Sequence, residues 1–283
     1  MNESHELDNQ ALKQQLQQQY KSKEVKELNF PTEIIDLPSK GLLYSENHPL
    51  RDGRVEMKYM TAKEEDILSS QSLIKKGIVL DRLFKSLIVG NGEGVQFEYD
   101  DLVVGDKDAI MVAARVLGHG KDYEVTITID GVQEPQPIVV DLTKLKDKEF
   151  DEELFTKYGN DIPFVLPISK KNITFKILTG ADEKKIQAEV ARIKNKVKGD
   201  DVDHTNSTKL KYIITSIEDN DSQAEINKFV DNFLLSRDSF ELKEYIKQIQ
   251  PGVDLRVNIE IPEEGTSDMY DIPIDVSFFW PGV

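Results

Sequence analysis

The sequence predicts an α+β protein with two tandem related domains, each with several helices and a small antiparallel sheet of β-hairpins. Two observations predict this class. Segments with the alternating apolar pattern of strands occur among amphipathic segments with helical spacing. The same order of motifs also occurs twice, which is typical of a duplicated domain, because the units of solenoid proteins are shorter.

The two copies share an entry strand, a helix with an acidic first turn, further helix and a closing hairpin. In the first copy these segments are DLPSKGLLY (36–44), VEMKYMTAKEEDIL (55–68) and DKDAIMVAARVLGHGKDYEVTITI (106–129). In the second copy they are VLPISKK (165–171), ITFKILTGADEKKI (173–186) and RDSFELKEYIKQIQPGVDLRVNIEI (237–261). Chance similarity is the alternative interpretation. We place the domains at residues 30–150 and 151–283.

The composition agrees with two domains and limits the possible functions. A chain of 283 residues with 39% hydrophobic content can bury one large core or two of ordinary size. A net charge of −16 repels phosphate backbones, so we expect no nucleic-acid partner. The absence of cysteine excludes disulfides and thiolate metal sites. No apolar run is long enough for a membrane span, so we expect a soluble protein made in a cytoplasm.

Residues 1–29 predict a flexible leader, because they hold few large apolar side chains and a glutamine cluster. Leu12, Leu16 and Tyr20 have the spacing of one helical stripe that could dock against a partner. A frayed helix or a disordered leader is the alternative.

In the first half, the alternation in VEMKYM (55–60) predicts a strand, and Thr61 with Glu64 has the spacing of a capping box. We expect that helix to end at Gly77 and a second helix to cover VLDRLFKSLIVG (79–90). A third helix is predicted to begin at Asp106 or Asp108 and to end near Gly118 and Gly120. A hairpin with a turn at Asp130–Gly131 follows.

In the second half we expect a hairpin in LPISKKNITFKIL and a long helix over about residues 182–197. Three amphipathic helices follow, in TKLKYIITSIED (208–219), SQAEINKFVDNFLLS (222–236) and DSFELKEYIKQI (238–249). DLRVNIEI (254–261) and YDIPIDVSFF (270–279) are predicted to form a closing hairpin.

The sequence holds no arrangement of residues that predicts catalysis, a metal or a cofactor. The four histidines, at positions 5, 48, 119 and 204, are scattered, without the spacing of a zinc protease. Asp200, Asp201 and Asp203 with His204 could bind a cation weakly, but the pattern lacks the glycine and terminal glutamate of an EF-hand. GNGEG (90–94) is predicted to be a turn rather than a phosphate-binding loop, because no GK[ST] ending follows. We therefore predict a protein that is not an enzyme.

The aromatic cluster near the C-terminus is the first candidate for partner binding. Phe278, Phe279 and Trp280 lie together, and in a strand at least one of these rings needs cover beyond a single core face. Burial in the core of the second half, or packing between the two halves, is the alternative. A weaker partner-binding candidate is the segment Leu42, Leu43 and Tyr44.

Four segments in a fixed order, LPSKGLLY, YMTAKEEDIL, AARVLGHGKDYEV and FFWP, carry a resemblance to a known family. In these segments the chain resembles the baseplate hub and hub assembly proteins of T4-like contractile-tailed bacteriophages, over most of residues 33–283. The resemblance implies a subunit or assembly factor of the hub that binds other baseplate and tail proteins in the host cytoplasm. It implies no enzymatic activity.

The chain departs from this family in one respect. Relatives often carry Cys-x-x-Cys pairs in the two hairpins, which suits structural zinc, and this chain has no cysteine. The resemblance therefore implies no metal site in this chain. Two other functions stay open: a permanent structural part of the tail, such as a wedge or tube component of the virion, and a hydrolase that uses a pair of carboxylates.

Overall fold

The computed structural model describes residues 31–128, 135–196, 202–261, 266–274 and 278–280. The chain divides after Thr32 into a short N-terminal unit and a second unit of residues 33–283. The predicted leader with its stripe of Leu12, Leu16 and Tyr20 lies outside the described residues, as does the turn predicted at Asp130–Gly131.

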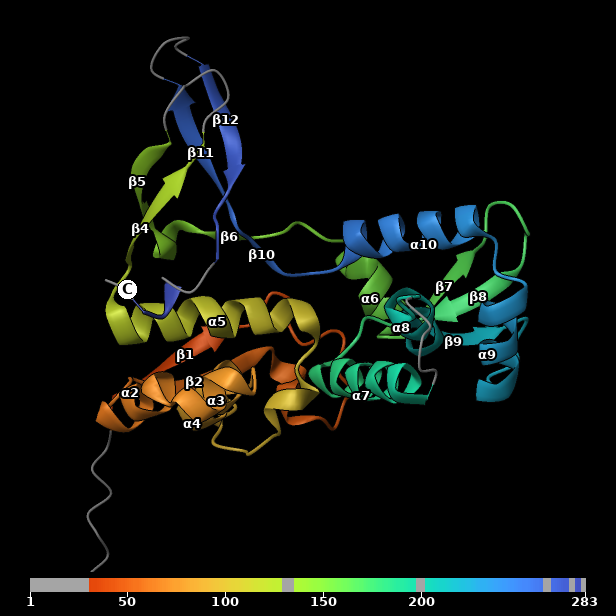
Figure 1. Cartoon of the computed structure of the whole chain (residues 1–283), viewed down its shortest axis with the longest axis horizontal. Helices are drawn as coiled ribbons and strands as arrows, with labels where there is room; N and C mark the ends of the chain where they lie inside the picture. The colour runs from red at the N-terminus through yellow and green to blue at the C-terminus, as the bar shows by residue number, and fades with distance from the viewer. Residues whose placement is uncertain (1–30, 129–134, 197–201, 262–265, 275–277, 281–283) are drawn as a thin grey trace, which may run out of the picture. The chain divides into compact units, whose positions relative to one another are not determined.

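The first part of the fold is a three-stranded sheet in the order β1–β2–β3, with short helices beside it (Figure 1). Its middle strand buries Val55 and Met57 completely, and its outward side chains are polar. This alternation agrees with the strand predicted from VEMKYM. The elements are β1 (Thr32–Asp36), η1 (Pro49–Asp52), β2 (Arg54–Lys58), α2 (Ala62–Ser69), α3 (Gln71–Lys75), α4 (Val79–Leu87), β3 (Ile88–Gly90) and η2 (Tyr99–Asp101).

A second three-stranded sheet, β7–β8–β9, follows the same pattern. Its middle strand buries Ile173 and Phe175, and both sheets have an irregular register between the middle and the last strand. The elements are β7 (Ile162–Val165), β8 (Asn172–Phe175), α7 (Gly180–Lys196), α8 (Thr205–Ile213), β9 (Ile214–Ile217) and α9 (Gln223–Asn232).

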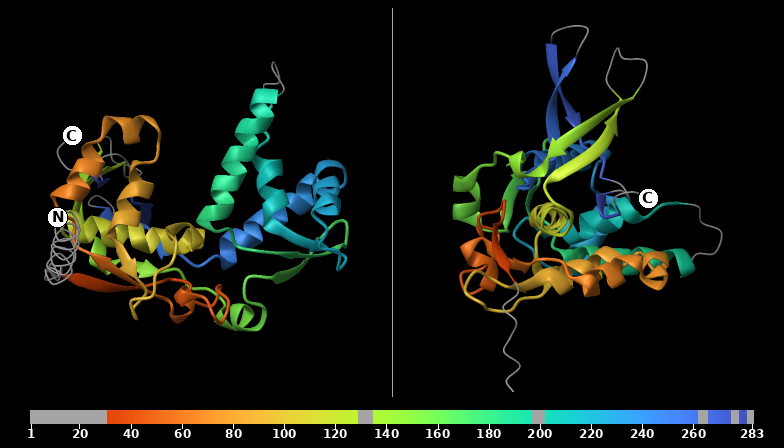
Figure 2. Two further views of the ribbon diagram at one scale, coloured as in Figure 1. Left: turned by 90° about the horizontal axis from the view of Figure 1, so that it is seen from below. Right: turned by 90° about the vertical axis from the view of Figure 1, so that its left-hand side faces the viewer.

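Each sheet is followed by a long helix and then by an antiparallel hairpin. The two hairpins project on the same side of α5, as Figure 1 and the right-hand panel of Figure 2 show. A groove of about 530 Å³ lies between β5 and β11 and contains the side chains of Val139 and Met269. The elements are α5 (Val104–His119), β4 (Asp122–Ile127), β5 (Gln136–Asp141), α10 (Ser236–Ile249), β11 (Arg256–Ile261) and β12 (Thr266–Asp271).

The connector between the predicted halves packs against the second half. Asp147 in β6 pairs with Val253 in β10, and the amide of Lys148 donates to the carbonyl of Gly252. Residues 33–283 accordingly form one compact unit, which contains both predicted domains. The elements are η3 (Leu142–Lys144), β6 (Lys146–Asp147), α6 (Glu152–Tyr158) and β10 (Val253–Asp254).

The predicted α+β class is confirmed by this arrangement, but three local predictions are wrong. The helices predicted over residues 79–90 and 208–219 end early, at Leu87 and Ile213, and continue directly as the strands β3 and β9. Their β-branched residues, such as Ile88 and Ile214, favour the extended pairing with the middle strand. The helix predicted to run to Gly77 is interrupted at Ser70, whose extended backbone separates α2 from α3.

Two further corrections concern where elements begin and end. Helix α5 begins at Val104 with Val103 as its N-cap, so Asp106 lies in the first turn rather than at the cap. The second strand of the closing hairpin was predicted over residues 270–279, but it is β12, Thr266–Asp271, which lies mostly in the predicted connection. Pro273 follows closely and cannot donate to a sheet, and Phe278 to Trp280 form a turn.

Candidate protein-binding surface

The aromatic residues predicted to bind a partner pack against other residues of the chain. Phe278 and Phe279 are buried and contact Tyr123 and Phe84, with ring centroids 5.0 and 5.7 Å apart. Trp280 is half-buried, and its indole N–H donates to the carbonyl of Leu68 at 3.1 Å. These contacts are with elements of the first half. The three side chains therefore lie as the alternative interpretation has it, packed between the two halves.

The second predicted segment is also engaged internally. The hydroxyl of Tyr44 donates to the buried carboxylate of Asp106 at 2.6 Å and accepts from the amide of Val103 at 3.0 Å. Burial, together with the charge of Asp106, raises the pKa of Tyr44. Leu43 is buried and Leu42 is half-buried against the core. A partner-binding role for these residues and for the C-terminal aromatic residues stays a prediction.

Several described residues that were weighed for chemistry take part in local caps and turns. His48 accepts from the amide of Leu50 through Nδ1, which caps the short helix η1. The side chain of Asn91 closes the GNGEG turn by accepting from the amides of Glu93 and Val95. Within the described ranges, no three His, Asp or Glu side chains are arranged to hold a metal ion. Asp200 and Asp201 of the proposed cation loop lie outside those ranges, and Asp203 accepts from Thr205.

Exposed apolar side chains mark a different part of the molecule, which the sequence did not predict. Ile168, Phe233, Leu235 and Phe240 are 48%, 57%, 45% and 57% exposed. They lie where the β7–β8 connection and the end of α9 meet the start of α10, at the right of Figure 1. We call these four residues the corner surface. Large apolar side chains exposed to this extent near one junction of elements often mark a site of protein interaction.

Asp238 holds the parts of the corner surface together. Its buried carboxylate accepts from the amides of Ile168 at 2.7 Å and Ser169 at 3.0 Å, which fixes the β7–β8 connection to the first turn of α10. Burial alone would raise the pKa of Asp238, but the backbone hydrogen bonds outweigh it and lower the pKa. The position of an acid in the first turn of a helix adds to this stabilisation. The surface is therefore built on a fixed support.

Beside the corner surface lies a shallow hollow of about 400 Å³, with Phe229 and Phe233 in its wall. Ile217 of β9 also lines it, and the other lining residues are polar: Lys171, Glu218, Asn220, Glu225 and Lys228. Aromatic rings mixed with charged side chains are also found at protein-binding sites. The exposed guanidinium of Arg237 adds a positive charge on α10.

The start of the long helix α5 in the first half is covered. Val103 at the start of α5 forms an antiparallel bridge with Thr179 at the start of α7 and is 1% exposed. The amide of Val104 donates to Leu178 at 3.0 Å, and the amide of Gly180 donates to Leu102 at 2.9 Å. Here two helix starts join through a short extended pairing.

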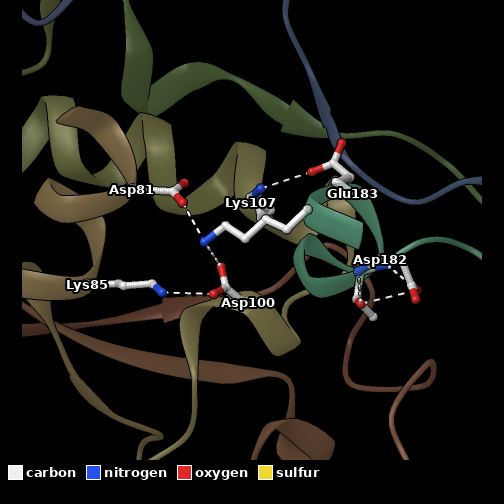
Figure 3. Close-up of polar contacts among 8 residues, drawn as sticks. Asp81, Lys85, Asp100, Lys107, Asp182 and Glu183 are labelled. Carbon is white, nitrogen blue, oxygen red and sulfur yellow. Dashed lines mark hydrogen bonds and ion pairs between the residues drawn. The ribbon is translucent and has the colours of Figure 1, made fainter. Parts of the chain in front are cut away.

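Ion pairs surround this internal contact (Figure 3). The ammonium of Lys184 lies 2.6 Å from Asp81 and 2.7 Å from Asp100, and Lys107 lies 3.1 Å from Glu183. Burial would raise the pKa of Asp100, but Lys184 and Lys85 outweigh that effect and lower it. The internal contact thus combines backbone pairing with complementary charges.

Comparison with protein families, with curated proteins and with solved structures finds no significant match to this chain. The described residues contain no helix long and apolar enough to cross a membrane. The chemistry and exposure of the chain's own residues therefore carry the functional argument.

Proposed function

We propose that this chain is a non-enzymatic protein-binding component of phage tail assembly, either a baseplate hub subunit or an assembly factor for the hub. The observation that supports protein binding is the corner surface, with its two half-exposed phenylalanines on a rigid support. The assignment to a phage baseplate rests on the order of sequence motifs that the chain shares with that family. Its partners would be other tail proteins in the host cytoplasm.

We also propose that the two halves are copies of one ancestral module. The support is a set of contacts that recur at matching places. Thr61 donates its amide and hydroxyl to Glu64, which lies 3.0 Å from Lys58. In the same way, the amide and hydroxyl of Thr179 donate to Asp182, which lies 2.8 Å from Lys176.

A second recurring contact links each long helix to its sheet. The carboxylate of Asp106 accepts from the amide of Ser39, and the carboxylate of Asp238 accepts from the amide of Ile168. Both acids are buried in the first turn of their helices, three residues after the N-caps Val103 and Leu235. Such matched caps and buried acids agree in chemistry as well as in position.

Affinity capture with the full-length chain tests the binding function. We expect the wild-type chain to retain identifiable tail proteins from infected cells, and Leu235→Asp to lose them, because a buried unpaired charge weakens an interface strongly. Val95→Asp is the matched control, since Val95 is exposed to a similar extent, 48%, on a loop of the first half. Equal capture by the wild-type and Leu235→Asp chains would contradict the role of the corner surface.

Mass spectrometry of purified phage particles distinguishes a hub subunit from an assembly factor. A hub subunit, or another permanent structural component such as a wedge or tube subunit, is recovered in stoichiometric amounts. An assembly factor is absent from finished particles. Recovery of the chain in neither assembly intermediates nor particles would contradict the phage assignment.

A further inference from the structure

The corner surface has a counterpart in the first half, and the two differ in exposure. Leu235 corresponds to Val103, because both are N-caps of the long helix, and Ile168 corresponds to Ser39, because both amides donate to the buried acid of that helix. Ser39 and Val103 are almost fully buried, whereas Ile168 and Leu235 are about half exposed. The surface is therefore covered in the first half and exposed in the second half.

Two segments of the second half cover the first surface: Pro251 and Gly252 approach α5 at Gly105 and Asp108, and the entry into α7 pairs with its start. Leu178 to Glu183, the entry into α7, supplies the backbone partners of Val104 and Leu102 and the carboxylate that binds Lys107. Within the described part of the chain, no segment pairs in this way with the backbone around Leu235. An equivalent cover for the corner surface would have to come from another molecule.

The chain carries a second copy of the covering segment. Residues Met60 to Asp66, which we call the α2 start, correspond to the entry into α7, because Thr61 and Thr179 make the same cap. Ala62, Glu65 and Asp66 in this segment are exposed. One chain therefore offers both an open receiving surface and an open covering segment.

We propose that the corner surface binds the α2 start of a second copy of this chain, in a head-to-tail contact. This inference rests on the proposed protein-binding function of the corner surface. A pseudo-twofold contact between the two halves would cover both pairs of surfaces within one chain, but only one pair is covered. The contact is therefore heterologous, and such contacts extend from molecule to molecule unless their geometry closes a ring.

Charge complementarity favours the α2 start as the occupant. Arg237 exposes 75% of its side chain on α10, and its only near acid in the described ion pairs is Glu241 at 4.0 Å. The α2 start exposes the carboxylates of Glu65 and Asp66 and the ammonium of Lys63, so its exposed charge is net negative. Docking beside Leu235 would bring this negative charge near the first turn of α10, which carries Arg237.

One difference between the two contacts limits the new one. Arg237 stands where the first half has Gly105, whose missing Cβ leaves room for the carbonyl of Pro251. The side chain of Arg237 excludes such a close backbone approach. The intermolecular contact is therefore limited to the α2 start, and its small area predicts a weak, concentration-dependent association.

Sedimentation of the full-length chain tests this inference. From the micromolar to the millimolar range, the average mass of the wild-type chain should rise above the monomer mass. Leu235→Asp and Ala62→Arg should each shift the midpoint of this rise to at least about tenfold higher concentration, because each places a charge within the proposed contact. Both residues are exposed, so both variants should fold. Val95→Asp should behave as the wild-type chain does.

Mixing the two variants gives the sharper result. Leu235→Asp keeps its α2 start and Ala62→Arg keeps its corner surface, so the mixture should form a one-to-one complex that does not grow further. No complex in the mixture, or undiminished association of Ala62→Arg alone, would overturn the head-to-tail contact.

The outcomes also separate this inference from the proposed function. A wild-type chain that stays monomeric throughout, while Leu235→Asp still loses tail proteins, overturns self-association and leaves the protein-binding function standing. A wild-type chain that self-associates as described but captures no tail protein supports the head-to-tail contact and contradicts the phage assignment.

Discussion

Replacing Glu64 by glutamine should destabilise the protein strongly at neutral pH and much less in acid. The carboxylate of Glu64 is fully buried and accepts from Ser86, from the amide and hydroxyl of Thr61, and from Lys58. Burial alone would raise its pKa, but these hydrogen bonds outweigh burial and lower the pKa from 4.5 to about 2. The charged form is therefore strongly favoured in the folded chain.

The pH dependence follows from the sign of this shift. A pKa that is lower in the folded chain stabilises the fold fully above the unfolded value of 4.5, and the effect is lost as the pH falls toward about 2. At about 1.36 kcal/mol per pH unit the charge of Glu64 contributes about 3 kcal/mol at pH 7 and about 1 kcal/mol at pH 3. Glu64→Gln should show this loss, because its amide cannot accept from all the same donors.

Urea denaturation of wild-type and variant chains at pH 7, 4 and 3 measures the difference. Glu65→Gln is the matched control, because Glu65 is the next residue on the same helical turn and is exposed. Its free energy of unfolding should change by less than about 0.5 kcal/mol. A loss below about 1 kcal/mol for Glu64→Gln at pH 7, or a loss that stays constant down to pH 3, would refute the assignment of a buried charged cap.

Two further predictions concern residues that join distant parts of the chain. Phe278→Ala should lower the free energy of unfolding by about 3–5 kcal/mol, because Phe278 is fully buried against Tyr123; a loss under about 1 kcal/mol in urea denaturation would place this ring outside the core. Gly105→Ala should cost at least about 1–3 kcal/mol, since a Cβ there would lie 1.7 Å from the carbonyl oxygen of Pro251; an unchanged melting temperature would show that the approach of α5 to Pro251 is looser.

The sequence predicted the elements whose signals are local. The capping box at Thr61 and Glu64, the alternation of VEMKYM and the first hairpin all depend on residues close together in the chain, and the described elements agree with them. The strands β3 and β9 were missed for a physical reason. Each is a short continuation of an apolar helix, and its extended form is set by pairing with a middle strand far away in sequence.

The candidate site depended on information that a sequence does not contain. Phe278 and Phe240 are both phenylalanines in amphipathic surroundings, yet one is fully buried and the other is 57% exposed. What separates them is whether a distant segment covers the ring. For Phe278 the cover includes Tyr123 of the first hairpin, a contact that spacing along the chain does not indicate.

One difference between the halves at the amino-acid level does point to the corner surface. At the helix position where the first half has Asp108, the second half has Phe240. Asp108 lies beside Gly252, and burial raises its pKa to about 6, so a polar residue stands where the chain covers itself. Phe240 is apolar where the chain leaves the same position open. In a monomer we would expect the polar residue at the exposed position and the apolar residue at the covered one, because exposed rings promote association. This distribution is what we expect if another molecule covers Phe240 in an assembly, whereas Asp108 is covered within the chain.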